Sequence, residues 1–251
     1  MKGTKCYLYW VIVVIMMGCS ANSRDYLTIA AAANMQFALE EIVEKFERQT
    51  SIKTQLTTSS SGKLTAQIRE GAPYDIFVSA DMKYPMEINR LGLALSPPKV
   101  YARGQLALWS IQNDWKVDLA ELSDSKINHI AIANPKTAPY GLAAIQTLER
   151  LQILKKIQNK LVFGESVSQT NQFIVTGSVE AGLTALSVLK SPQMKAQQNW
   201  IKVDTALYDP ILQGVIIINT TPMLSEAKAF YEFLFTPSAK NILHKYGYIT
   251  P

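Results

Sequence analysis

Five short turns, each between an apolar run and a helix-like segment, carry the side chains that could do chemistry in this sequence. They are Ala33-Asn34, Ser60-Ser61-Gly62, Ala80-Asp81, Tyr140-Gly141 and the turn that ends at Val167. Where a strand runs into a helix, the first N–H groups of the helix are unpaired and attract anions. Hydroxyl and amide side chains at the same turns add donors. The turns therefore predict a site that binds an anion through neutral hydrogen-bond donors.

Residues that would support an enzyme or a metal site are few. His129 and His244 are the only histidines and neither has a metal-spaced partner, while both cysteines lie in the first 19 residues. No nucleophile elbow, phosphate-binding loop or dinucleotide fingerprint occurs in the sequence. A hydrolase or transferase with Ser61 as nucleophile stays open as an alternative, but it needs a general base that no histidine or lysine motif supplies, although Lys63 is near. We therefore predict no catalytic residue, no direct metal ligand and no cofactor.

The first 19 residues are organised as an export signal. Lys2 and Lys5 precede an apolar run, residues 7–17, that ends in the small-residue segment Gly18-Cys19-Ser20-Ala21. Two interpretations stay open. The segment before Cys19 resembles a lipobox, in which case Cys19 receives lipid and becomes the new N-terminus. In the other interpretation, cleavage near Ala21 releases a soluble protein, and both place the mature chain in the periplasm or otherwise outside the cytoplasmic membrane.

The composition indicates a globular protein with a large core. Apolar residues make up 48% of the 251 residues and charged residues 18%, which argues against a disordered chain. The formal net charge is +5, and Lys2 and Lys5 in the export segment supply two of these charges. Since the remaining charge is mild and no Lys/Arg cluster is interleaved with aromatic residues, we predict no nucleic-acid partner.

Strand-like and helix-like segments alternate along the chain and must position the five turns. Asn34 and Asp81 are expected N-caps of the helices that follow them. Alternation of this kind predicts an α/β protein with parallel sheets covered by helices, and ligands bind such sheets at the carboxyl ends of the strands. Strands are expected within residues 27–33, 54–58, 76–79, 105–109, 129–134, 161–167, 179–189 and 214–218.

One block is diagnostic: Gly71-Ala72-Pro73-Tyr74-Asp75-Ile76-Phe77-Val78-Ser79-Ala80-Asp81. Together with the alanines before Asn34, the serines of 59–62, the segment 134–141 and the C-terminal segments 229–234 and 245–248, it resembles the periplasmic molybdate-binding proteins of ABC transporters. The resemblance covers the chain from Leu27 onward.

The resemblance implies a type II periplasmic-binding-protein fold with two lobes. Each lobe would be a mainly parallel sheet flanked by helices, with the ligand in the cleft between the lobes. Lobe I is expected to comprise residues 26–102 and 208–251, and lobe II residues 103–207. The resemblance further implies a monomer without enzymatic activity that delivers its ligand to a membrane permease.

The resemblance also assigns the binding residues. Ala33 and Asn34 occupy the first turn, Ser61 falls on the ligand serine, and Ala80 and Val167 fall on backbone donors. These groups, including Asn34, Ser61 and Val167, would contact the oxygens of the anion and not the metal atom. Some relatives supply a tyrosine from the segment where this chain has Ala185, whereas others place it in a Pro-Tyr-Gly turn, which Tyr140 matches.

The implied ligand is molybdate, with tungstate alongside it. A shell of donors suits a fully deprotonated dianion, whereas hydrogen phosphate brings a proton that needs an acceptor. Sulfate is also a bare dianion, so it would have to be excluded by the size of the cavity. A receptor or sensor for another tetrahedral oxyanion such as sulfate therefore stays open as an alternative.

Overall fold

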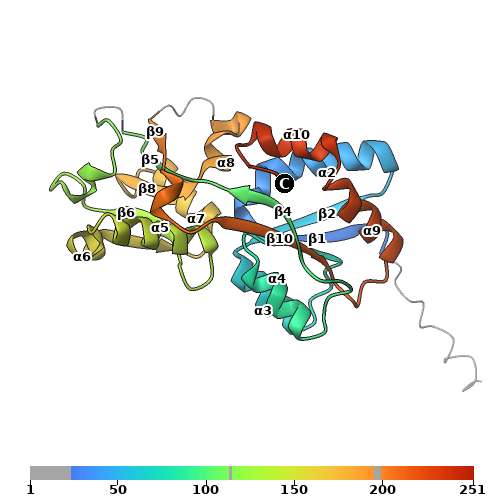
Figure 1. The fold of residues 1–251 in the computed structure, drawn as a ribbon. Coiled ribbons are helices and arrows are strands. Elements are labelled where there is room, and N and C mark those ends of the chain that lie inside the picture. The colour runs from blue at the N-terminus through green and yellow to red at the C-terminus, as the bar shows by residue number, and fades with distance from the viewer. Residues whose placement is uncertain (1–23, 113–114, 195–198) are drawn as a thin grey trace, which may run out of the picture.

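Two five-stranded sheets, each flanked by helices, form the framework of the protein in Figure 1. The computed structural model describes residues 24–112, 115–194 and 199–251. The predicted export segment, residues 1–19 with Cys19, lies outside the described residues. Within the described ranges, no helix has both the length and the apolar character needed to cross a bilayer.

The first sheet has the strand order β2-β1-β3-β10-β4. β1 pairs in parallel with β2 and β3, whereas β10 lies antiparallel between β3 and β4. The strands are β1 (Leu27–Ala32), β2 (Thr54–Ser59), β3 (Ile76–Val78), β4 (Lys99–Gly104) and β10 (Ile211–Ile217). The helices packed on this sheet are α2 (Gln36–Thr50), α9 (Leu224–Phe233) and α10 (Pro237–Lys245) on one face and α3 (Ser61–Arg69) and α4 (Lys83–Arg90) on the other.

The apolar composition of β1 follows from burial on both of its faces. Leu27, Ile29 and Ala31 are buried against α2, α9 and α10, and Ala30 is buried against α3 and α4. Successive side chains of a strand point to opposite faces, so a strand covered on both faces is mostly apolar, and in β1 the one exception is Thr28, whose hydroxyl accepts a hydrogen bond from Arg24. The strand ends where Ala33–Met35 forms a short 3-10 turn, η2, that leads into α2.

The second sheet has the order β7-β6-β8-β5-β9. β6 is parallel to β7 and β8, and β5 is antiparallel to β8 and β9. The strands are β5 (Leu106–Trp109), β6 (Ile130–Ala133), β7 (Leu161–Gly164), β8 (Ala181–Ala185) and β9 (Trp200–Lys202). The helices are α5 (Pro139–Arg150), α6 (Leu154–Ile157), α7 (Val167–Val175) and α8 (Leu186–Leu189), and the short 3-10 turns are η3 (Ala120–Ser123), η4 (Gln158–Lys160), η5 (Pro192–Met194) and η6 (Thr205–Leu207).

The chain passes between the sheets along two adjacent strands. β4 ends at Gly104, and β5 of the other sheet begins at Leu106. The chain returns from β9 to β10, where Ile211 is paired with Gly104. Figure 1 shows β4 and β10 running together through the middle of the molecule. The two connections between the sheets are therefore hydrogen-bonded to each other.

The structure differs from the sequence predictions in five places. The helix expected to start at Asn34 starts at Gln36, and Asn34 lies inside η2 without capping it. β4 and β9 were not expected as strands, because both are edge strands of mixed polarity. Residues 179–189 contain β8 followed by the short helix α8, and Leu154 belongs to α6, separated from α5 by a left-handed residue, Gln152 with φ 60°.

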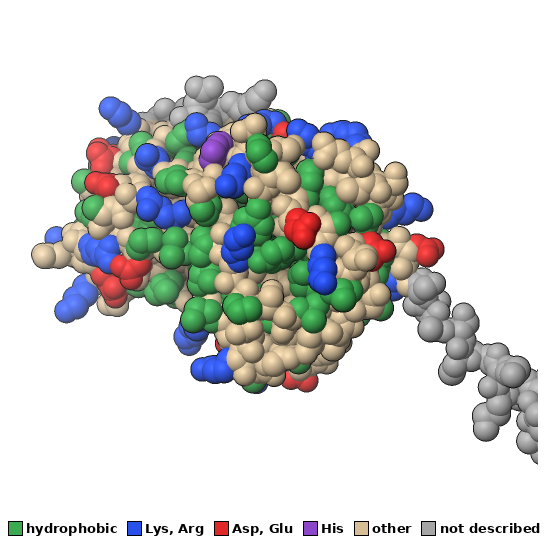
Figure 2. Space-filling view, turned by 45° about the vertical axis from the view of Figure 1, so that its right-hand side comes forward, with side chains coloured by type: hydrophobic (Ala, Val, Ile, Leu, Met, Phe, Trp, Pro, Cys, Tyr) green, Lys and Arg blue, Asp and Glu red, His purple; other side chains and the backbone are tan. Residues whose placement is uncertain are grey.

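Charged side chains are spread over the surface. On the face drawn in Figure 2, Lys and Arg side chains are interspersed with Asp and Glu, and no large patch of one sign covers it. Mixed charge of this kind keeps a protein soluble without creating a strong single-sign field.

Candidate functional site

A small cavity lies where the strand-to-helix turns of the two sheets meet. Its lining residues are Ala32, Ala33, Asn34, Ser60, Ser61, Ala80, Ala138, Pro139, Tyr140 and Val167. This set includes all six residues predicted for the site: Ala33, Asn34, Ser61, Ala80, Tyr140 and Val167. None of the lining residues carries a formal charge. About 10 Å³ is open to the centre of a water-sized sphere, which is close to the space of a single buried water.

The first turn contributes a backbone donor rather than the Asn34 side chain. Asn34 Nδ2 donates to Gln213 Oε1 at 3.2 Å and to the Tyr248 hydroxyl at 2.9 Å, so both of its hydrogens are used. Asn34 Oδ1 is buried and has no partner among the described residues. Because the first N–H groups of a helical turn lack intrahelical partners, the group that η2 offers to an anion is backbone N–H.

Ser61 and Ala80 bring the second and third turns together. Ser60 is the N-cap of α3, its Oγ accepting from Lys63 N at 3.4 Å, and Ser61 is the first helical residue. Ala80 N donates to Ser61 Oγ at 3.0 Å, and both residues are almost fully buried. Since Ser61 Oγ is the acceptor in this bond, its own hydrogen is available to donate.

Asp81, in the turn after β3, was expected to be the N-cap of α4. It binds a helical N–H as an N-cap does, but it is not the residue directly before the helix. Its Oδ1 accepts from Tyr84 N at 3.2 Å and from Ser79 Oγ at 3.3 Å, although α4 begins only at Lys83. Burial raises the pKa of the Asp81 carboxyl, and the hydrogen bond from Tyr84 N partly offsets that rise. Asp81 does not line the cavity, so its charge is not part of the site.

Tyr140 enters the site from α5 of the second sheet. Ala138 is the N-cap and Pro139 occupies the first position, where a missing N–H costs nothing. The Tyr140 side chain is 1% exposed, and its hydroxyl accepts a hydrogen bond from Gln213 Nε2 at 3.1 Å. Burial, with Tyr248 and Tyr101 nearby, raises the pKa of this hydroxyl well above its ordinary value. The hydroxyl therefore keeps its hydrogen at any physiological pH.

Val167 is the first residue of α7, so its contribution is also a backbone N–H. Ser166 is the N-cap, with Oγ accepting from Gln169 N at 3.4 Å. The Val167 side chain is buried against the core of the second sheet.

Four residues outside the cavity join the two sheets, and we call them the clasp: Gly62, Tyr84, Lys136 and Thr137. Gly62 N donates to Thr137 O at 2.9 Å, and the Tyr84 hydroxyl donates to Lys136 O at 3.1 Å. A Cβ on Gly62 would lie 2.9 Å from the Tyr84 hydroxyl and 3.0 Å from Thr137 Cα. The absence of a side chain at Gly62 thus allows the turns to approach this closely.

Gln213 and Tyr248 are site residues that the sequence prediction missed. Gln213 touches Asn34, Tyr140 and the Tyr101 hydroxyl, and Tyr248 touches both the side chain and the carbonyl of Asn34. The sequence contained one signal for Gln213, a single amide inside the apolar run of β10. A buried polar side chain requires hydrogen-bond partners, so such an amide indicates a polar contact. Tyr248 lay in a segment used for the family resemblance, but no role was assigned to it.

A comparison with known proteins decides the family. Residues 27–249 match the family model described as "Bacterial extracellular solute-binding protein". The chain belongs to this family.

Individual relatives of this solute-binding protein cover nearly its whole length. It is 34% identical to the molybdate-binding protein ModA of Azotobacter vinelandii over 93% of each chain. It is 35% identical to ModA of Rhodobacter capsulatus, over 95% of this chain and 94% of the relative. The solved structure titled Azotobacter vinelandii periplasmic molybdate-binding protein superposes with a TM-score of 0.86 at 33% identity, covering 90% of this chain and 99% of that one. This match confirms the predicted two-lobed α/β fold.

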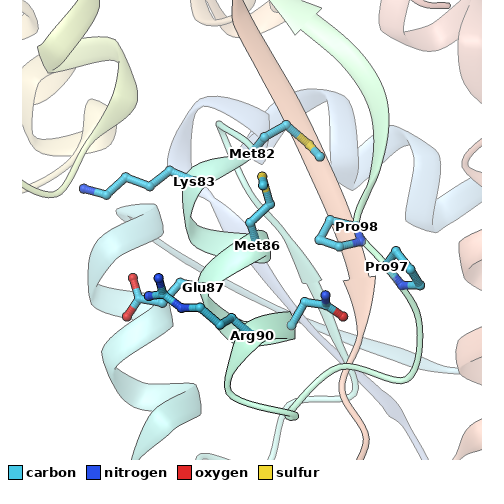
Figure 3. Close-up of a pocket in the computed structure, with 8 residues that line it drawn as sticks. Met82, Lys83, Met86, Glu87, Arg90, Pro97 and Pro98 are labelled. Atoms are coloured by element: carbon cyan, nitrogen blue, oxygen red, sulfur yellow. The ribbon is translucent and has the colours of Figure 1, made fainter.

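A larger hollow in the same solute-binding protein lies away from these turns. It measures about 740 Å³ and lies beside α4 and the loop before β4. Figure 3 shows Met82 and Met86 on one side and Pro97 and Pro98 on the other, with Lys83, Glu87 and Arg90 around the rim. This hollow is a broad depression whose rim carries both signs of charge. It lacks the converging donors of the small cavity, which is therefore the candidate site.

Proposed function

We propose that this chain captures molybdate outside the cytoplasm and delivers it to the permease of an ABC transporter. The observation that carries the proposal is a buried cavity lined by neutral groups at the starts of η2, α3, α5 and α7. The names of the two relatives described above, both at more than 30% identity, support the same ligand. Tungstate has the same shape and charge, so it is the second ligand that we propose.

The proposed donors come from five residues of both lobes. They are the Ser61 and Tyr140 hydroxyls, the backbone N–H groups of Asn34 and Val167, and the backbone N–H of Ala80, which here donates to Ser61 Oγ and would have to turn from it to the anion, with Ala33 forming part of the wall. A hydrogen bond to a charged group contributes about 1.5–3 kcal/mol, so several neutral donors hold a dianion without a lysine or arginine. The unpartnered Asn34 Oδ1 is an acceptor in the same wall. Protonated phosphate is for this reason the competitor that a binding experiment has to include.

The experiment is a melting-temperature measurement with each anion. Micromolar molybdate or tungstate is expected to raise the melting temperature, because a ligand that binds only the folded state adds about 2.7 kcal/mol at a hundredfold excess over Kd. Phosphate and sulfate at the same concentration are expected to leave it unchanged. A clear shift with phosphate or sulfate and none with molybdate would replace the proposal by a receptor for that anion.

Binding without catalysis is the second part of the proposal. Ser61 Oγ accepts from a backbone N–H, and the lining residues include no histidine, lysine or carboxylate to act as its base. Lys63, the nearby lysine, forms an exposed ion pair with Glu165 at the surface. These observations support a binding protein over a serine-dependent hydrolase, and incubation with candidate esters tests the difference.

The remaining parts of the proposal concern organisation and location. We place lobe I at residues 26–102 and 208–251 and lobe II at 103–207, although β4 continues to Gly104, past the first boundary. We propose that the protein is a monomer. We also propose that it has no nucleic-acid partner, which the interspersed charges on the face drawn in Figure 2 support. Attachment through a lipid on Cys19 is tested by mass spectrometry of the mature N-terminus, with release after cleavage near Ala21 as the other outcome.

A further inference from the structure

We propose that Gln213 is a positioning residue of the anion site, which orients the Tyr140 hydroxyl so that its hydrogen is left for the ligand. The inference rests on the proposed function. It concerns a side chain that does not line the cavity but contacts two residues that do, one from each lobe. Gln213 would thus act through Tyr140 rather than by touching the anion.

The position of Gln213 in the fold forces its side chain inward. It lies in β10, where the pairing with β4 shifts register between Gln213 and Gly214. A bulge of this kind turns a side chain away from its regular direction. The residue is completely buried. A buried amide without partners would cost about 1–3 kcal/mol, so its hydrogen bonds decide which way it can point.

The partners of Gln213 Oε1 fix the orientation of the amide. The Tyr101 hydroxyl donates to Oε1 at 2.7 Å, and Asn34 Nδ2 donates to the same oxygen at 3.2 Å. Two donors on one side require the carbonyl oxygen of the amide to be there. The NH₂ group must then face the opposite side, where it donates to the Tyr140 hydroxyl at 3.1 Å.

The consequence for Tyr140 follows from the number of hydrogens on a hydroxyl. A tyrosine hydroxyl has one hydrogen and can also accept. Because it accepts from Gln213 Nε2, it does not donate to that side chain, and its hydrogen stays available to another acceptor, the neighbouring Tyr248 hydroxyl or an anion. If the amide were reversed, the Tyr140 hydrogen would be used on Gln213 Oε1. The donor that an anion requires would then be lost.

Gly104 provides the space for this contact. A Cβ on Gly104 would overlap the Tyr140 hydroxyl and would lie 2.5 Å from Gln213 Nε2. Gly104 ends β4 at the connection between the sheets, opposite Ile211. The bond between Tyr140 and Gln213 therefore lies against the crossing strands, and it forms only when the two lobes are in the arrangement seen here.

The test is a double-mutant cycle on molybdate affinity. Tyr140→Phe removes the hydroxyl, and Gln213→Met removes the amide at similar volume. Each is expected to weaken binding by about tenfold or more, as for one lost charge-assisted bond. The double variant is expected to lose clearly less affinity than the product of the two single losses, because the part of the Gln213 effect that acts through the Tyr140 hydroxyl disappears with that hydroxyl. If Gln213 only stabilised the fold, the losses of affinity caused by the two variants would instead multiply.

A control cycle pairs Gln213→Met with Ser61→Ala. Ser61 does not contact Gln213, so these effects should multiply. If Gln213→Met does not fold, Tyr101→Phe removes one of the donors that hold Oε1, and its loss of affinity should vanish in the Tyr140→Phe background. If the losses of affinity multiply when Tyr140→Phe is combined with Gln213→Met or with Tyr101→Phe, the inference is wrong. Failure of the parent protein to bind any oxyanion would overturn the proposed function instead, so the two failures are distinguishable.

Discussion

At the scale of single residues, the site depends on where hydrogens are left unused. Ser61 accepts from Ala80 N and Tyr140 accepts from Gln213 Nε2, so each hydroxyl retains a hydrogen to donate. Both Nδ2 hydrogens of Asn34 are engaged, which leaves its backbone N–H for a ligand. The Ser61 and Tyr140 hydroxyls and the turn at Asn34 are thus held in place before an anion enters, which lowers the cost of ordering on binding.

Replacement of Ser61 by alanine is expected to weaken molybdate binding by ~10- to 100-fold, because a buried dianion loses one charge-assisted bond of about 1.5–3 kcal/mol. Isothermal titration calorimetry measures the loss. The control is Thr236→Ala, which removes the N-cap of α10, where Oγ1 accepts from Ala239 N at 3.3 Å. That variant should lose about 1 kcal/mol of stability and keep its affinity. Unchanged affinity in Ser61→Ala would move the site elsewhere.

Sequence reasoning reached part of this residue-level picture. Ser61, Ala80 and Val167 lie at turns that the sequence identified, because small residues between a strand and a helix are visible in the sequence. The sequence placed Asn34 at the correct turn. The N-cap role expected of it is wrong, because its side chain bonds to Gln213 and Tyr248. Those partners are 179 and 214 residues away in sequence. No local pattern reveals contacts of that range.

At the scale of elements, the turn at the start of α3 joins the two lobes through the clasp. Gly62 N and the Tyr84 hydroxyl donate to carbonyls of the loop before α5. β3, β5 and β6 were predicted because each is an unbroken apolar run buried on both faces, and β1 because Thr28 is its single polar residue. The sequence missed β4 and β9, which are edge strands whose pairing on one side relaxes the demand for apolar residues. It also could not show that β10 runs antiparallel, because strand direction depends on distant connections.

Gly62→Ala is expected to weaken molybdate binding more than it changes the stability of the ligand-free protein. The added methyl group would lie 3.0 Å from Thr137 Cα, so the loop before α5 must move away for the lobes to close. Calorimetry and ligand-free melting measure the two effects.

The control for Gly62 is Gly71→Ala. Gly71 has φ +84° and open space around it, so an alanine there is strained by about 1 kcal/mol without touching the clasp. It should lower the melting temperature and leave affinity unchanged. Equal losses of affinity in both variants would show that closure does not depend on the clasp.

At the scale of the whole molecule, the proposed binding mode couples ligand binding to lobe closure. The proposed donors come from both sheets, so an anion makes all of its contacts only when the lobes are together. A ligand shifts a conformational equilibrium by its differential affinity for the two states. Molybdate should therefore compact the protein, whereas a ligand held by one lobe alone would not.

Tyr140→Phe is expected to move the contraction measured by small-angle scattering to higher molybdate concentration, by about tenfold or more for one lost charge-assisted bond. The ring stays in the core of the second lobe, so ligand-free stability should change little. Tyr74→Phe is the matched control, because the Tyr74 hydroxyl bonds to Gln67 at the exposed surface, at 3.0 Å, and Tyr74 does not line the cavity. If both variants contract at the parent concentration, the Tyr140 hydroxyl has no role in closure.

The position of the cavity between the lobes has a consequence for timing. Since its lining comes from turns of both lobes, an anion captured as proposed leaves when the lobes separate. Its escape must wait for the Gly62–Thr137 and Tyr84–Lys136 bonds to break. The residence time is then a property of the protein's opening rate, and weakening the clasp should accelerate release far more than capture. A permease that pulls the lobes apart would set the moment of discharge without competing for the anion.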